Sequence, residues 1–167
     1  MTFAMCWAHS KKGQPTENWQ PLRQHLENVA ARAADFAAPF HSAEWARLAG
    51  LLHDLGKASP AFQNYLRKSN GLDASDYDAY GQPSTHSGAG AALALDKYGP
   101  VGRLLAYLVL GHHAGLPDWI GGVQPNGALT QRLESARDEL NAANSWHNRL
   151  NLPAHLPSPP RKMAHAE

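Results

Sequence analysis

The sequence predicts an all-α fold. Apolar residues recur at steps of three and four along most of the 167-residue chain, as they do on the buried face of a helix. Proline and glycine residues interrupt this pattern and separate one periodic stretch from the next. No stretch of useful length alternates apolar and polar residues in the manner of a strand, and the chain contains no internal repeat.

Three helices are predicted in the first part of the chain, over residues 21–39, 43–55 and 60–66. Pro21 suits the first helical position, where its missing N–H costs nothing. Ser59 and Pro60 read as an N-cap followed by a first-turn proline, which opens the third helix. Residues 69–84 are acidic, contain glycine and are weakly periodic, so we expect a surface loop there.

Three further helices are predicted, over residues 86–97, 101–112 and 128–144. Thr85 is a candidate cap for the first of them, and Gly99 with Pro100 separates it from the second. Residues 115–127 hold several glycines and prolines and are expected to form a loop.

The end of the chain has a different composition. Residues 151–167 are rich in proline and contain little to bury, which is typical of a linker or tail. We therefore assign residues 1–150 to one domain and residues 151–167 to a proline-rich tail or linker.

Length and composition limit the class of protein. A chain of 167 residues is long enough for one domain with a real core. The net charge of +1 gives no bulk attraction for nucleic acid, so any such function must come from a local site. Cys6 is the only cysteine, which excludes a disulfide framework and a cysteine-based zinc site. The chain has no signal peptide and no apolar run of membrane-spanning length, so we expect a cytoplasmic protein.

The residues that say most about chemistry are His53 and Asp54, which are adjacent in the segment GLLHDLGKAS. Adjacent side chains on a helix diverge by about 100°, so the two cannot form one compact hydrogen-bonded pair. They can offer an imidazole nitrogen and a carboxylate to metal ions that lie across the helix end. In the alternative interpretation Gly56 is the left-handed residue that ends a helix, and His53 is incidental. The doublet alone does not decide between the two.

Other histidines lie at helix ends or on apolar helix faces, namely His25, His86, His112 and His113. Taken singly, each is more readily explained as a hydrogen-bonded core or cap residue. Taken together with Asp54 they favour a metal site, because burying several imidazoles without partners is costly. A set rich in imidazole favours manganese, iron, cobalt, nickel or zinc over magnesium.

Two ions that share Asp54 would suit hydrolysis of a phosphodiester. Lys57, three residues later, could contact a phosphate oxygen as a point charge. In the alternative interpretation, Lys57 is a solvent-exposed lysine that stabilises a helix terminus. Trp119 follows the His112–His113 turn and could stack a base of the substrate at the mouth of the site, although core packing is its ordinary role.

Five segments within residues 6–119 carry a family resemblance: CWAHS, WQPLRQHLENVAARAADFA, GLLHDLGKASPAFQNYL, THSGAGAALAL and GHHAGLPDW. In these segments the sequence resembles the HD nuclease domain of the CRISPR-associated nuclease-helicase of type I systems. That domain lies within the HD superfamily of metal-dependent phosphohydrolases. The resemblance implies a helical HD-domain fold and an endonuclease or exonuclease that cleaves single-stranded DNA. The implied cofactors are one or two ions of manganese, iron, nickel or cobalt.

The resemblance also implies partners and residue roles. The partners would be single-stranded DNA, a helicase domain in cis or trans, and the type I CRISPR surveillance complex, with no membrane involved. The first ion would be held by His25, His53 and Asp54. The second ion would be held by Asp54, His86, His112 and His113. Lys57 matches the lysine of the HD-x-x-K element near the scissile phosphate. His9 matches a recurrent feature of the family, for which we expect a structural or rim role and no metal.

The chain departs from the family pattern in two ways. The first ion normally takes a further aspartate from a later segment similar to S-A-L-V-D-A-D, and no such segment occurs here. The acidic residues after His113 lie in other contexts; they are Asp118, Glu134, Asp138, Glu139 and Glu167. We therefore interpret the chain as a C-terminally truncated HD domain whose first-ion half is the weaker one. No G-x-x-x-x-G-K-[ST] motif occurs, so unwinding would require another segment or chain.

Two alternative functions stay open at this point. The chain could be an HD phosphohydrolase of nucleotides or cyclic dinucleotides, because GHHAGLP is similar to an element of cyclic-dinucleotide phosphodiesterases, although the D-G-x-G-Y-P that would follow it is missing. It could also be a metal-stabilised module that docks a helicase or the surveillance complex without cutting.

Overall fold

The computed structural model describes residues 5–72, 86–113, 115–116, 118–120, 128–143 and 145–158. The α-helices are α1 (Leu22–Ala37), α2 (Ala43–Leu52), α3 (Pro60–Lys68), α4 (Gly88–Tyr98), α5 (Arg103–Gly111) and α6 (Leu129–Ala142). Short 3-10 helices are η1 (Thr16–Asn18), η2 (Ala38–Phe40), η3 (Leu55–Ala58), η4 (Gly99–Gly102) and η6 (Trp146–Arg149). The strands are β1 (Trp7–His9) and β2 (Gln20–Pro21). The predicted all-α class is confirmed.

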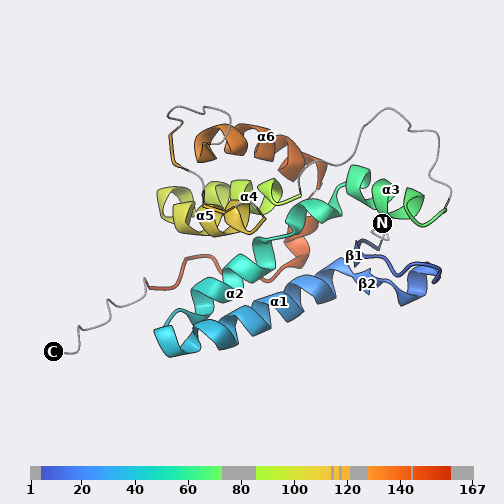
Figure 1. Cartoon of the computed structure of the whole chain (residues 1–167). Coiled ribbons are helices and arrows are strands. Elements are labelled where there is room, and N and C mark those ends of the chain that lie inside the picture. The colour runs from blue at the N-terminus through green and yellow to red at the C-terminus, as the bar shows by residue number, and fades with distance from the viewer. Residues whose placement is uncertain are drawn as a thin grey trace.

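Helices α1 and α2 form an antiparallel pair (Figure 1). The periodicity predicted for α1 is present, since its buried residues are Leu22, Leu26, Ala30 and Ala34. Gly50 of α2 lies against the α1 backbone, where a Cβ atom would come within 2.6 Å of the Cα atom of Ala30. This close approach brings the C-terminal end of α2 beside the helix that carries His25.

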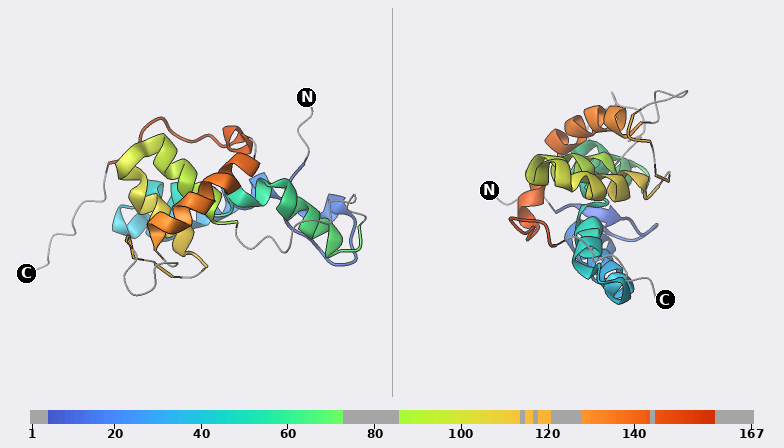
Figure 2. Two further views of the ribbon diagram at one scale, coloured as in Figure 1. Left: turned by 90° about the horizontal axis from the view of Figure 1, so that it is seen from above. Right: turned by 90° about the vertical axis from the view of Figure 1, so that its left-hand side faces the viewer.

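Helix α4 lies at the centre of the other helices. It packs against α5, α6 and the end of α2, and successive levels of the molecule hold α6, then α4 with α5, then α2 with α1 (Figures 1 and 2). Small residues allow this position, and α4 is buried over its whole first part, from Gly88 to Ala94. The candidate cap Thr85, residues 73–84 of the predicted loop and residues 121–127 lie outside the described residues.

The N-terminus of α4 is capped from another helix. Ser87 is the N-cap residue, but its side chain makes no capping hydrogen bond. Instead the carboxylate of Glu139 in α6 accepts from the backbone N–H groups of Gly88 (3.0 Å) and Ala89 (3.3 Å). Helix α3 begins as predicted, with the Ser59 hydroxyl accepting from the N–H of Phe62 at 3.3 Å.

A two-stranded hairpin that the sequence pattern does not predict precedes α1. Pro21 is not the first residue of a helix but pairs with Trp7 in β2, with an extended backbone (φ −59°, ψ 137°). Strands this short offer no alternation to detect, which is why the prediction for Pro21 was wrong. Trp7 and Trp19 bury their rings with Phe62 and Leu66, so this second apolar cluster fixes the hairpin against α3.

Residues 151–158, the first part of the predicted tail, lie against the helices. The hydroxyl of Tyr98 donates to the carbonyl of Pro153 (3.0 Å), and the indole N–H of Trp45 donates to the carbonyl of Ser158 (3.0 Å). Leu152 and Leu156 pack on the main core. Residues 159–167 lie outside the described residues.

Among the helices that the structure describes, none combines the length and the apolar character needed to cross a membrane.

Candidate metal centre

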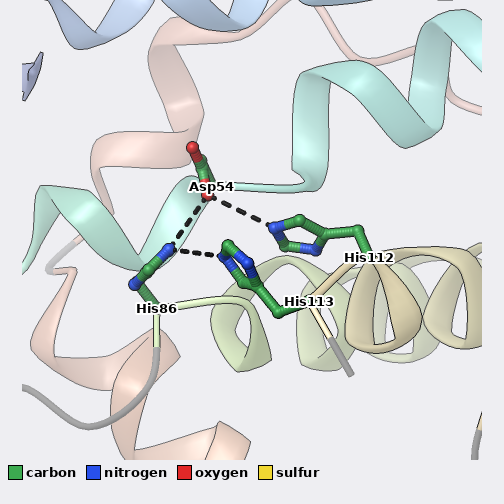
Figure 3. A group of neighbouring side chains, drawn as sticks. All are labelled: Asp54, His86, His112 and His113. Carbon is green, nitrogen blue, oxygen red and sulfur yellow. Dashed lines mark hydrogen bonds and ion pairs between the residues drawn. The ribbon is translucent and has the colours of Figure 1, made fainter. Parts of the chain in front are cut away.

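The predicted metal ligands and Lys57 gather around the carboxylate of Asp54. His25 comes from the first turns of α1, His53 caps the C-terminus of α2, and Asp54 follows it directly. His86 precedes α4, and His112 and His113 follow α5 (Figure 3). Asp54 is only 4 % exposed, so its charge must be balanced by its neighbours.

The oxygen Oδ2 of Asp54 faces one set of nitrogens. It lies 3.1 Å from Nε2 of His25 and 3.2 Å from Nε2 of His53. The ammonium of Lys57 is at 2.8 Å from the same oxygen. The two imidazole nitrogens are themselves 3.2 Å apart.

The oxygen Oδ1 faces a second set. It lies 3.3 Å from Nε2 of His86 and 3.5 Å from Nε2 of His112. The ring of His113 approaches His86, with 2.8 Å between the two Nε2 atoms (Figure 3). Oδ1 is buried and has no hydrogen-bond partner within the described part of the chain. A buried carboxylate oxygen left in this state is costly, and a cation among these nitrogens would satisfy it.

Backbone carbonyls orient two of the imidazoles. Nδ1–H of His53 donates to the carbonyl of Gly50 at 2.8 Å, and Nδ1–H of His112 donates to the carbonyl of Val109. A neutral imidazole carries one proton, so Nε2 of each ring then presents a lone pair toward Asp54. Lone pairs directed at a carboxylate repel it unless a cation lies between them. The same hydrogen bond on the far nitrogen is typical of metal-bound histidine, and the donor set therefore fits a metal ion.

The pKa shifts agree with this arrangement. Burial acts to raise the pKa of the Asp54 carboxyl, but its contacts with the imidazoles of His112, His25 and His53 outweigh burial and hold that pKa well below its usual range. Burial lowers the pKa of His86 to about 4. Burial also opposes protonation of His112, yet its contacts with Asp54 and the Val109 carbonyl raise its pKa overall. At neutral pH the carboxylate is thus ionised and His86 is neutral, the forms that bind metal.

Among the described residues, two groups of side chains could each hold a metal ion. One consists of Asp54, His86, His112 and His113. The other consists of His9, His25 and Asp54. Within each group the ligand atoms lie within 4.8 Å of one another. The second group includes His9, for which we expected a structural or rim role and no metal. The AHS segment drew attention to this residue, but no periodicity could reveal the strand that places it.

Lys57 is not the solvent-exposed lysine of the alternative interpretation. It is 5 % exposed, pairs with Asp54, and its ammonium lies 5.5 Å from the centre of the Phe62 ring. Its burial depends on η3 and α3 packing together, which local sequence cannot show.

Gly56 is not a left-handed helix stop either, because it is absent from the described glycines with positive φ. Its N–H donates to the carbonyl of His86 at 3.1 Å. A Cβ atom at this position would lie 2.5 Å from that carbonyl oxygen. The glycine therefore allows the segment before α4 to approach the segment that carries Asp54.

We expect Gly56→Ala to push His86 away from Asp54 and to weaken metal binding by the second group about 10-fold or more, the size of effect found when ligand orientation is lost. Metal titration of the purified variant measures this. Gly13→Ala is the control for a glycine substitution away from the site, because a Cβ atom there meets no neighbour within 4 Å. The positive φ of Gly13 means that this variant loses some stability, but its metal affinity is expected to stay unchanged. Unchanged metal affinity in Gly56→Ala would show that the contact with His86 is dispensable.

Trp119 is not brought to the cluster. Its ring lies 5.9 Å from that of Tyr107, and the guanidinium of Arg103 lies 4.3 Å from its ring centre. Both partners belong to α5 before its last turn, whereas His112 follows its end. The chain turns at Gly115, which has a positive φ of 78°. Trp119 thus packs against the first part of α5, and its base-stacking role stays a prediction.

A helical domain built around an adjacent His–Asp pair, with further histidines from other helices, defines the HD class of metal-dependent phosphohydrolases. A family model described as "Cas3, HD domain" matches residues 7–165, and the chain belongs to that family. The family consists of metal-dependent nucleases that act in type I CRISPR systems. The comparison with curated proteins found no match.

Proposed function

We propose that this protein is a metal-dependent nuclease that cleaves single-stranded DNA in type I CRISPR interference. The observation that supports it is the carboxylate of Asp54, whose two oxygens face two separate sets of imidazole nitrogens. A bridging carboxylate between two nitrogen-rich sets is the ligand arrangement that a pair of ions requires. A helicase, in cis or in trans, and the surveillance complex would supply the single strand.

In this proposal Asp54 is shared between two ions. The first would be held by His25, His53 and Asp54. The second would be held by Asp54, His86, His112 and His113. The imidazoles favour manganese, iron, nickel or cobalt. When bound, such ions polarise phosphoryl oxygens and lower the pKa of water.

The protein's own residues would position the substrate. His112 and His113 are exposed while Asp54 is buried, so the site is reached from the side of the segment after α5. A polymer strand can approach such an open edge without entering an enclosed cavity. The ammonium of Lys57 carries three donors, and its bond to Asp54 leaves capacity for a phosphate oxygen. The same bond fixes the position of that positive charge.

The test is cleavage of circular single-stranded DNA by the purified protein. We expect no cleavage after treatment with a chelator, and linearisation and fragmentation of the circle when manganese, iron, cobalt or nickel is added back. Deoxynucleoside triphosphates and cyclic dinucleotides are assayed in parallel. Hydrolysis of these alone would replace our proposal with a nucleotide phosphohydrolase. Metal binding without any hydrolysis would replace it with a docking module.

A further inference from the structure

His9 lies beside the first-ion half of the centre. Its ring and that of His25 are 4.8 Å apart between centres and nearly perpendicular, at 77°. We propose that His9 is itself a metal ligand, so that strand β1 completes the half of the centre formed by His25 and Asp54. This inference rests on the metal centre of the proposed function.

The spacing of the donors supports this role. The ligand atoms of His9, His25 and Asp54 lie within 4.8 Å of one another. Metal–nitrogen bonds of about 2.1 Å place two ligands of one ion up to about 4.2 Å apart. Side-chain shifts of less than about 1 Å therefore bring all three donors onto one ion. His9 is exposed, so its ring has room for such a shift.

A β-bulge directs His9 toward the site. Trp7 pairs with Pro21 and His9 pairs with Gln20, so β1 holds one more residue than β2 between these two pairs. In a regular strand, residues two apart share a face. The bulge breaks that rule: Trp7 enters the apolar cluster with Trp19, while His9 lies against His25. Bulges of this kind often redirect a side chain next to an active site.

One side chain holds the strand in place. The amide nitrogen of Gln63 donates to the carbonyls of Trp7 (2.9 Å) and Lys57 (2.6 Å), and its oxygen accepts from the N–H of Trp7 (3.0 Å). Gln63 thereby joins β1 to η3, which begins directly after Asp54. The backbone of β1 is thus held against the segment that follows Asp54, while the exposed ring of His9 keeps room to move.

The experiment isolates the first-ion half. In a His86→Ala/His113→Ala background the second group loses two of its ligands, and Co²⁺ titration of the metal-free protein follows the remaining ion by its visible absorption. Adding His9→Ala is expected to weaken Co²⁺ binding about 10-fold or more and to change the absorption spectrum. His9→Gln, which keeps polarity but offers only an amide, is expected to do the same. His155→Ala is the matched control, because this exposed histidine lines a cleft with Tyr98 at the other end of α4.

The outcomes separate the two proposals. Unchanged affinity and spectrum in both His9 variants would overturn the role of His9 and leave the proposed nuclease intact. A background that binds no Co²⁺, although the unaltered protein binds it, would also overturn this role, since no separate first-half ion would exist. Absence of Co²⁺ binding by the unaltered protein would instead refute the metal centre. Circular dichroism confirms that each variant is folded.

Discussion

Asp54→Asn is expected to lower the rate of metal-dependent DNA cleavage by about 10³-fold or more. The substitution keeps the shape of the side chain but removes its charge, and it turns one oxygen into an NH₂ group that faces imidazole nitrogens. Loss of an outer-sphere partner alone costs 10- to 100-fold in metal affinity or activity, and a shared ligand should cost more. Single-turnover cleavage of circular single-stranded DNA measures the rate, and metal analysis of the purified variant counts the ions.

This substitution also affects folding, because Asp54 is the partner of the buried Lys57. Breaking a buried ion pair on one side costs about 3–5 kcal/mol of stability. The double variant Asp54→Asn/Lys57→Met removes both charges, so we expect it to regain thermal stability and to stay inactive. A folded Asp54→Asn protein that cleaves DNA at nearly the unaltered rate would show that Asp54 does not bridge metal ions.

Gly90→Ala is expected to lower stability strongly without altering any residue of the metal centre. A Cβ atom on Gly90 would lie 1.9 Å from the carbonyl oxygen of Leu52, so α4 and the end of α2 would have to separate. Overpacking in a core costs about 1–3 kcal/mol and sometimes more, and a clash with backbone belongs at the upper end. We expect the melting temperature to fall by roughly 6 °C or more for a chain of this length. Thermal denaturation followed by circular dichroism, in the presence of a chelator, measures it.

Gly111→Ala is the matched control within another helix. The nearest atom to a Cβ there is a terminal methyl of Leu116, at 3.0 Å, which can move aside. Alanine also favours a helix over glycine by up to about 1 kcal/mol. We therefore expect little change or a small gain in stability. Equal melting temperatures for the two variants would mean that α2 and α4 are not packed as tightly as described.

The helices and the gathering of the histidines could be predicted because each depends on local pattern. Periodicity located α1 to α6 within a few residues, and histidines on inward faces or at helix ends were expected to meet in a small helical domain. The assignment of individual ligands stays a prediction. The hairpin escaped detection because its strands are too short to show alternation. The burial of Lys57 and the position of Trp119 depend on tertiary packing and on the turn at Gly115, for which the local sequence carries no signal.

The residues around Asp54 come from segments that are distant along the chain, from α1 to the end of α5. An ion bound among them would therefore act as a cross-link that the unfolded chain cannot form. Each ion present at 100 times its dissociation constant would add about 2.7 kcal/mol to the stability of the folded state. Metal supply would then govern the lifetime of the protein as well as its activity, since a metal-starved cell would hold a nuclease that is both idle and more readily degraded by proteases.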